Sequence, residues 1–449
     1  MSVWDEDVLE TMAMEVTDVF IAIDAALDRK LTAEEARNRN IIDGYAEDSK
    51  YAVHEGDRYY RIIVLKGGSR SSKTYSLMQK FNEEMMDRKV KITVWRAEKT
   101  NCRATVMEDF EDIVISDEGI FDEYVNNKTK GRFKNKETGG MIQFEGTDSP
   151  SKVHGMKQHW SLFNEATEIS ENVFLQIKQR TSEVVFVDYN PSKAFFIERM
   201  FDREDLIVIH STYEDNAFCP LEIVKELRGY NPFHPEDSHL PREERRPHPT
   251  NIKNGTADEY MYDVYCLGLQ AEKPGKIYNG WSRISVKDYE DLEYEKVIGL
   301  DFGLIVPTAA IEIKFDGDNS MYIRQKVYKE MNMMKHELGD EFEHHTNLNK
   351  KSEIIIADPN NKDEINKLLA DDWEVYRANK KPGSVIAGIK TVMSMRVYVC
   401  EDSHDIWDEY MNYAWRFTPK GEKLEEPVKK DDHAMDAFRY GGVYLKTQA

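Results

Sequence analysis

The chain has 449 residues, of which 40% are hydrophobic and 32% are charged, and its formal net charge at pH 7 is −22. This length fits two domains with sizeable cores, and the acidic balance argues against a surface that coats nucleic acid non-specifically. We expect no membrane span and no signal peptide, because no apolar run is long enough and the N-terminus is acidic. The cysteines form no CxxC pair, which indicates reduced thiols in a cytoplasm: Cys102, Cys219, Cys266 and Cys400.

Residues 1 to about 50 form an acidic segment whose apolar residues have helical spacing. Thr32 with Glu35 is typical of a capping box at the start of a helix. No chemically informative pattern occurs in this segment. We therefore expect a helical arm that packs on the next domain or on a neighbouring molecule.

The stretch 66–74, Lys-Gly-Gly-Ser-Arg-Ser-Ser-Lys-Thr, follows a strand-like apolar run at 61–65 and precedes a segment with helical spacing. A strand, a small-residue loop ending in Lys-Thr and a helix are the context of a P-loop. Lys73 then reaches the outer phosphates, and the Thr74 hydroxyl can hold Mg²⁺. Ser72 replaces the usual second glycine, which requires a backbone outside glycine-only dihedral space. The alternative is an ordinary polar loop between strand and helix.

From residue 51 to about 210, apolar strands alternate with helical segments, which indicates a parallel α/β sheet with helices on both faces. The strand ending at Phe163 is followed by Asn164 and Glu165, where a P-loop protein carries an acidic pair. Asn164 has no charge, so we expect only an indirect contact with metal. Glu165 is the candidate general base and Glu168 a weaker one. The alternative is a helix N-terminus, where glutamate is favoured by the dipole.

Two further positions complete the candidate ATPase site. The run Asp188-Tyr189-Asn190-Pro191 follows a strand and is a turn signal, but in a motor it is also the place of a γ-phosphate sensor. Arg70, Arg96 and Arg180 could each offset charge in the transition state. Arg70 is favoured, because its position in the loop brings it near the phosphates.

The signals change after about residue 210. A Pro- and His-rich stretch at 230–249 predicts a solvated loop or a lid insertion. A second unit is expected to begin near Glu293. The segment 418–427 has the pattern of a hairpin. Two runs of Lys and Arg, at 128–136 and 377–381, could contact phosphate, although most such runs are solvated faces.

Four acidic residues of the second unit form the other candidate site. Asp301 and Asp358 each end an apolar strand, and Asp432 and Asp436 lie on one face of a predicted helix. A two-metal nuclease needs such a set, because carboxylates bind Mg²⁺ loosely and leave room for a phosphate between the ions. Each acid taken singly is ordinary, since strands often end in Asp.

Taken in order, these motifs resemble the large subunit of tailed-phage terminases, the ATP-driven DNA-packaging motors. The resemblance covers about residues 50 to 445 and is carried by the segments 67–74, 162–166, 188–191, 210–216, 299–303 and 432–440. It implies an α/β protein with an N-terminal P-loop (ASCE) ATPase domain and a C-terminal RNase H-like nuclease domain of the resolvase type. We expect four parts: a helical arm at 1–50, the ATPase core at 51–210, a lid or linker at 211–292 and the nuclease at 293–449.

The resemblance also implies roles for single residues. ATP and its Mg²⁺ would be bound by Gly67, Gly68, Ser69, Arg70, Ser71, Ser72, Lys73, Thr74 and Asn190. Glu165 would be the hydrolytic base, with Arg70 assisting. Two Mg²⁺ or Mn²⁺ ions of the nuclease would be held by Asp301, Asp358 and Asp432, with Asp436 as a candidate fourth ligand. Ser72 and Asn164 depart from the commonest pattern of the family.

The function implied is a motor that translocates double-stranded viral DNA into a procapsid and an endonuclease that cuts concatemeric DNA. The partners implied are DNA, a portal protein, a small terminase subunit and further copies of the chain in a pentameric ring on the procapsid, within the host cytoplasm and without a membrane. In such a nuclease the hairpin would gate access of DNA. The alternatives are a host P-loop repair helicase-nuclease, which a missing second motor lobe disfavours, and a non-catalytic capsid assembly adaptor.

Overall fold

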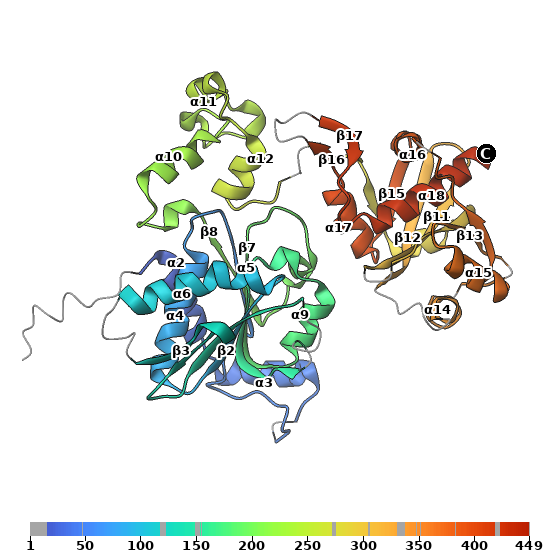
Figure 1. Cartoon of the computed structure of the whole chain (residues 1–449). Coiled ribbons are helices and arrows are strands. Elements are labelled where there is room, and N and C mark those ends of the chain that lie inside the picture. The colour runs from blue at the N-terminus through green and yellow to red at the C-terminus, as the bar shows by residue number, and fades with distance from the viewer. Residues whose placement is uncertain are drawn as a thin grey trace, which may run out of the picture. The chain divides into compact units, whose positions relative to one another are not determined.

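The computed structural model contains two compact units, Met1–Ala271 and Glu272–Ala449, called here the N-terminal and C-terminal units (Figure 1). The division into four parts expected from the sequence stays a prediction. The residues that the structure describes are 16–46, 48–116, 123–148, 153, 155–271, 275–303, 306–329, 337–346, 348–350, 352–381, 383–417 and 423–448. No helix in these ranges is both long enough and apolar enough to span a bilayer.

An eight-stranded sheet forms the centre of the N-terminal unit, in the order β3-β4-β5-β2-β6-β7-β1-β8. The strands from β5 to β8 in this order are parallel, whereas β3 and β4 form an antiparallel edge. The predicted parallel α/β sheet is therefore confirmed. The strands are β1 (Ile62–Gly67), β2 (Lys91–Arg96), β3 (Tyr124–Asn127), β4 (Arg132–Asn135), β5 (Met141–Gly146), β6 (Gln158–Phe163), β7 (Thr181–Tyr189) and β8 (Leu206–Ser211).

Helices cover both faces of this sheet, because side chains alternate along each strand. On β1, Ile63 and Leu65 pack into a core that includes Phe81 of helix α4, whereas Ile62 and Val64 join a second core with Phe174 of helix α9. Among the described residues, the α-helices of this unit are α2 (Asp18–Asp28), α3 (Ala33–Asp43), α4 (Lys73–Asp87), α5 (Lys99–Ala104), α6 (Val106–Ser116), α9 (Glu171–Lys178), α10 (Leu221–Gly229), α11 (Pro249–Asn254) and α12 (Glu259–Met261).

The described part of the arm before the sheet contains two helices, α2 and α3. Helix α3 begins with the predicted capping box, in which Glu35 N donates to Thr32 Oγ1 and Thr32 N donates to Glu35 Oε2. Helix α2 packs on α4 through Val19 and Ile23, which are buried in the same core as Phe81. The arm thus packs on the domain that follows it, which is one of the two arrangements expected from the sequence. The apolar positions expected at the very start of the arm lie outside the described residues.

The C-terminal unit is built on a mixed seven-stranded sheet in the order β14-β13-β10-β11-β12-β15-β9. Its centre, β10-β11-β12, is antiparallel, and its flanking strands pair in parallel. The strands are β9 (Ser282–Ile284), β10 (Glu295–Asp301), β11 (Thr308–Phe315), β12 (Ser320–Lys329), β13 (Ile354–Ala357), β14 (Glu374–Arg377) and β15 (Arg396–Cys400). The helices are α13 (Val286–Glu290), α14 (Glu337–His345), α15 (Lys362–Ala370), α16 (Ser384–Met393), α17 (His404–Asn412) and α18 (His433–Gln448).

A short antiparallel pair, β16 (Trp415–Phe417) and β17 (Lys423–Pro427), confirms the predicted hairpin. Residues 418–422, which connect the two strands, lie outside the described residues. The role of this hairpin in gating DNA stays a prediction.

Helix α18 lies unusually close to β10, and glycine makes this approach possible. A Cβ atom on Gly299 would lie 2.0 Å from the carbonyl oxygen of Ala437 in α18, and one on Gly441 would lie 3.3 Å from Gly299 N. The side chain of residue 299 is thus excluded by the backbone of the helix. This contact fixes the first turn of α18 near the carboxyl end of β10, where Asp301 is located.

We expect Gly299→Ala to destabilise the C-terminal unit by about 1–3 kcal/mol or more, because the added methyl group forces α18 away from β10. Differential scanning calorimetry of the full chain measures this change. Gly229→Ala is the matched control, since a Cβ there meets its nearest atom at 3.8 Å. An unchanged melting profile for Gly299→Ala would contradict the close contact.

Candidate functional site

The predicted P-loop lies between β1 and α4 and encloses the ammonium group of Lys73. Lys73 Nζ donates to Gly68 O at 2.6 Å, to Ser71 Oγ at 3.1 Å and to Asn190 Oδ1 at 3.0 Å. Burial lowers the pKa of Lys73 to about 8, although Asp188 acts in the opposite direction. Two residues expected to bind nucleotide, Lys73 and Asn190, are thus brought together from α4 and from the end of β7.

Ser72 adopts the left-handed conformation, with φ 66° and ψ 9°. Glycine favours this region, and another L-residue reaches it at a cost of about 1 kcal/mol. The serine hydroxyl has partners that glycine would lack, namely Thr17 Oγ1 at 2.9 Å and Ser76 Oγ at 3.3 Å. The departure from the usual glycine is therefore tolerated, and it connects the N-terminal arm to the loop through Thr17.

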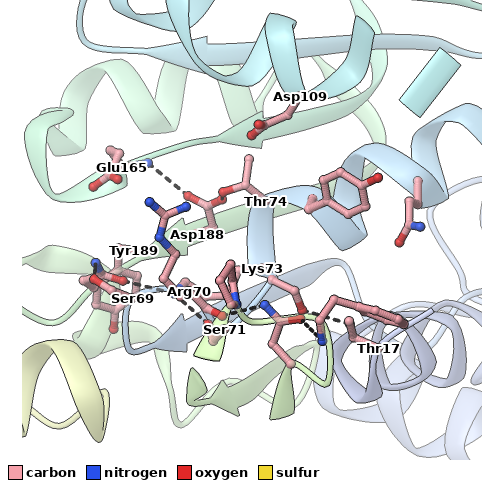
Figure 2. A pocket seen from close by; sticks show the side chains of 17 residues that line it. Thr17, Ser69, Arg70, Ser71, Lys73, Thr74, Asp109, Glu165, Asp188 and Tyr189 are labelled. Carbon is pink, nitrogen blue, oxygen red and sulfur yellow. Dashed lines mark hydrogen bonds between the residues drawn. The ribbon is translucent and has the colours of Figure 1, made fainter. Parts of the chain in front are cut away.

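A cavity of about 610 Å³ opens beside the loop (Figure 2). It is lined by loop residues 69–74 together with Glu165 and Asp188, which come from the ends of neighbouring strands. Parallel strands place their carboxyl ends at one edge of the sheet, which is where such sheets bind ligands. The cavity has the size of a ligand site, and its polar residues are those of the predicted nucleotide site.

Glu165 follows β6 and has a left-handed backbone, with φ 51° and ψ 48°. Its backbone N–H donates to Asp188 Oδ1 at 3.0 Å, as Figure 2 shows, and its carboxylate lines the cavity. Burial, and then the charge of Asp188, raise the pKa of Glu165 above its ordinary value. A carboxylate with a raised pKa is suited to accept a proton from water near neutral pH.

The sequence alone did not single out Asp188 as a site residue, although the structure places it at the centre of the site. Thr74 Oγ1 donates to Asp188 Oδ2 at 2.8 Å, and Asn164 Nδ2 donates to both carboxylate oxygens at 2.9 and 3.0 Å. The available signal was an acidic residue near the carboxyl end of β7, the buried strand that pairs with β1. The sequence indicates this residue only as part of a turn, in a run that could carry a γ-phosphate sensor, and not as a site residue by itself.

Arg70 is the arginine that the structure places at the cavity. It lies in the loop with φ 60°, and its carbonyl oxygen accepts from Asn216 Nδ2 at 2.8 Å. Its side chain extends from the loop into the cavity in Figure 2. Arg96 instead donates to Thr105 Oγ1, and Arg180 donates to Gln176 O. The role of Arg70 in catalysis stays a prediction.

The acidic residues of the C-terminal unit gather at one end of its sheet. Strands β10 and β13 are parallel neighbours in which Leu300 pairs with Ala357. Asp301 and Asp358 are the next residues, so they follow paired positions on the two strands. Asp432 and Asp436 come from the start of α18, which packs against β10 at Gly299. Local sequence could not bring these acids together, because they are spread over more than a hundred residues of the chain.

Each of these carboxylates has a basic partner. The ion pairs and hydrogen bonds join Asp301 to His433 at 3.0 Å, Asp358 to Lys380 at 2.6 Å, Asp432 to Lys429 at 3.3 Å and Asp436 to Arg439 at 2.7 Å. In the described part of the chain, no group of three or more His, Cys, Asp or Glu side chains is arranged to hold a metal ion. The role of Asp301, Asp358 and Asp432 as metal ligands stays a prediction.

The chemistry of this set nevertheless suits a hard divalent cation. Asp301, Asp358 and Asp432 are each at most 9% exposed, and carboxylate oxygens are the ligands that Mg²⁺ and Mn²⁺ prefer. Burial raises the pKa of both Asp301 and Asp432, and the negative charge of Asp436 raises them further. A bound cation would relieve this repulsion.

Of the two basic runs, 377–381 supplies Lys380 to this acidic group, whereas in 128–136 Lys128 forms an ion pair with Glu111. Neither Lys380 nor His433 was predicted from the sequence as a site residue. Contact of either run with phosphate stays a prediction.

Glu409 of α17 contacts the first turn of α18. Its carboxyl group is buried and accepts from Met435 N at 3.0 Å, and its other oxygen bonds to Tyr328 Oη at 2.7 Å. Burial raises the pKa of Glu409 to about 8, far above its ordinary value. The carboxyl group is therefore mostly neutral at pH 7 in the folded protein.

We expect the free energy of unfolding to fall as the pH rises from about 5 to 8, because Glu409 loses its proton at a lower pH in the unfolded chain than in the folded protein. The slope is at most about 1.4 kcal/mol per pH unit. Glu409→Gln keeps both hydrogen bonds without a titratable proton and should remove this contribution. Urea unfolding of both proteins at several pH values measures the difference. Parallel pH profiles for the two proteins would refute the buried neutral carboxyl group.

The two units together define a class of protein. The N-terminal unit has the fold and loop of a P-loop nucleotide-binding domain, and the C-terminal unit has an RNase H-like architecture with acids at the end of a mixed sheet. Comparison with known families agrees: residues 60–240 match the model described as phage terminase large subunit, and residues 301–441 match the terminase RNAseH like domain. The chain belongs to the phage terminase large subunit family. The fold class expected from the sequence is confirmed.

Individual relatives are distant. The terminase large subunit of Escherichia phage T5 is 24% identical over 251 residues, which are 52% of this chain and 51% of that protein. The match thus spans about half the length of this relative. Among solved structures, the large terminase of the thermophilic bacteriophage D6E is 16% identical, with a TM-score of 0.40, over 97% of this chain and 99% of that one. The nuclease domain of the SPP1 large terminase with bound Mn is 23% identical, with a TM-score of 0.32, over 36% and 92%.

Proposed function

We propose that this protein is the ATP-driven motor that translocates double-stranded viral DNA into a procapsid, and that its C-terminal unit is a Mg²⁺- or Mn²⁺-dependent endonuclease that cuts concatemeric DNA. The observation that carries the proposal is the meeting of Lys73, Thr74 and Glu165 at one cavity in a chain of the terminase family. The proposed partners are a portal protein, a small terminase subunit and further copies of the chain in a pentameric ring. The proposed location is the host cytoplasm, docked on the procapsid during packaging.

In the N-terminal unit, residues 67–74 and Asn190 are proposed to bind the triphosphate. Lys73 is already buried beside Asn190, so its charge is held where the outer phosphates would lie. Glu165 lines the same cavity and is proposed to accept the proton of the attacking water. Arg70 is proposed to offset the charge that develops on the transferred phosphate. Mg²⁺, when bound beside Thr74, would neutralise phosphate charge.

In the C-terminal unit, Asp301, Asp358 and Asp432 are proposed to hold two divalent ions, with Asp436 as a fourth candidate ligand. The lysines that now bond to Asp358 and Asp432 would have to move away when the ions bind. A bound pair of ions would generate hydroxide and stabilise the leaving oxygen. Because cutting depends on backbone phosphates, the nuclease should tolerate many sequences.

The test is to incubate the purified full chain with ATP, plasmid DNA and either Mg²⁺, Mn²⁺ or EDTA, and to follow phosphate release and plasmid cleavage. Metal-dependent cleavage together with ATP hydrolysis is the expected result. A protein with neither activity would be the assembly adaptor. Strand separation of a fluorescent duplex during ATP hydrolysis would favour the repair helicase-nuclease, since a packaging motor moves intact duplex.

A further inference from the structure

Building on the proposed ATPase function, we propose that Asp188 of β7 supplies the negative charge that holds the nucleotide-bound Mg²⁺, in place of the residue at position 164. The Mg²⁺ site of this motor would then use Thr74 and Asp188, and Asn164 would be a neutral hydrogen-bond donor to Asp188. The acidic group would thus come from β7 and not from position 164, which follows the neighbouring strand β6.

The position of Asp188 supports this assignment. Strand β7 lies between β1 and β6 in the sheet, and Asp188 pairs with Leu65 of β1, directly before the loop. Thr74 Oγ1, the hydroxyl expected to contact Mg²⁺, donates its proton to Asp188 Oδ2 at 2.8 Å. This bond uses the Thr74 proton. Asn164 Nδ2 donates to the same oxygen at 3.4 Å, which leaves one of its two lone pairs to face a cation. Asp188 also lines the cavity, whereas Asn164 is not among the lining residues.

The neighbourhood of Asn164 explains why this position carries an amide. Asn164 Nδ2 lies 2.9 and 3.0 Å from the two oxygens of Asp188. A second carboxylate at this distance would be repelled by the first, and one of the two would take up a proton. An amide instead donates a hydrogen bond to Asp188 and adds no second negative charge. The chain therefore has one acid at this point, and the structure places it on β7.

Beside Asp188, one buried oxygen lacks a hydrogen-bond donor, and a hydrated ion could supply it. Asn164 is 4% exposed, and its Oδ1 has no hydrogen-bond partner among the described residues. A buried acceptor without a donor is costly, and a water ligand of Mg²⁺ would supply the donor. Asp188 is itself 2% exposed. Among the residues that the structure describes, its carboxylate accepts hydrogen bonds only from groups without a full positive charge: Thr74, Asn164 and the backbone N–H of Glu165.

The competing explanation is that Asp188 only braces the loop and the turn at Glu165. Both explanations predict a defect when Asp188 is removed, so activity alone does not separate them. They differ in the effect of metal on nucleotide affinity. A brace affects binding with and without Mg²⁺, whereas a metal-holding carboxylate affects only the gain in affinity that Mg²⁺ produces.

The experiment titrates the full chain with a fluorescent, non-hydrolysable ATP analogue in EDTA and in Mg²⁺. For Asp188→Asn we expect unchanged affinity in EDTA and a loss of about 10- to 100-fold in the Mg²⁺-bound state. The double variant Asn164→Asp/Asp188→Asn exchanges the two groups across their hydrogen bond and should recover most of the Mg²⁺ effect. Asp202→Asn, which removes an exposed carboxylate of the same unit that does not line the cavity, should retain it.

Three results would overturn the proposal. The first is an intact Mg²⁺ effect in Asp188→Asn, and the second is an equal loss of affinity in EDTA and in Mg²⁺ for that variant. The third is a double variant that melts like the wild type but is as defective as Asp188→Asn. A wild-type chain that neither binds the analogue nor hydrolyses ATP would instead count against the ATPase function itself. The two failures are therefore distinguishable.

Discussion

Glu165→Gln is expected to lower ATP hydrolysis by about 10²- to 10⁴-fold while nucleotide binding persists, because the amide cannot accept the proton of the attacking water. The variant keeps the size of the side chain and the backbone bond from Glu165 N to Asp188. Phosphate release under steady-state conditions measures the rate, and binding of a fluorescent ATP analogue measures occupancy. Lys73→Ala should in contrast lose both, since it removes the buried cation beside the phosphate site.

Glu168→Gln is the matched control, because Glu168 belongs to the next turn and does not line the cavity. The raised pKa of Glu165 also has a consequence for the pH profile. The base must be ionised to act, so the rate should fall, as the solution is acidified, at a pH above the ordinary pKa of a glutamate. Retention of more than about a tenth of wild-type activity in Glu165→Gln would remove Glu165 as the base.

Asp301→Asn should abolish plasmid cleavage, with a loss of more than about 100-fold, and leave ATP hydrolysis within about twofold of wild type. Asp301 is buried at the end of β10, and Asp358 follows the neighbouring position on β13. Solvent therefore cannot take over the role of the Asp301 carboxylate. The ATPase residues belong to a separate compact unit, which is why the two activities should be separable.

Gel analysis of plasmid in Mn²⁺ measures cleavage, and phosphate release measures the ATPase in the same preparation. Asp340→Asn, an exposed acid of α14, is the control for a change of charge elsewhere in the unit. Simultaneous loss of both activities in Asp301→Asn, with an unchanged melting profile, would argue against two independent sites.

Much of the fold followed from local sequence. The apolar run before Lys66 became β1, the segment after Ser72 became α4, and Thr32 with Glu35 capped α3, because each depends on neighbours within a few residues. Backbone propensity and capping act over such short ranges. The predicted hairpin was confirmed by β16 and β17 for the same reason.

The candidate sites were predictable only in part. Residues with a recognisable spacing, such as Lys73 and Thr74, could be identified directly. Asp188 could not be assigned, because its partner Thr74 is 114 positions away and only the pairing of β7 with β1 brings them together. Lys380 likewise meets Asp358 through the fold, and in the sequence it looked like a solvated basic run.

The sequence by itself therefore determined the elements, the P-loop and the acids available for metal, because these depend on the order of side chains along one strand, loop or helix. The tertiary structure alone decided which acid lies opposite Thr74 and which basic groups cover Asp301 and Asp358. The physical reason is that an electrostatic contact depends on distance in space, and here the distances are set by strand order and by the close packing of α18 on Gly299.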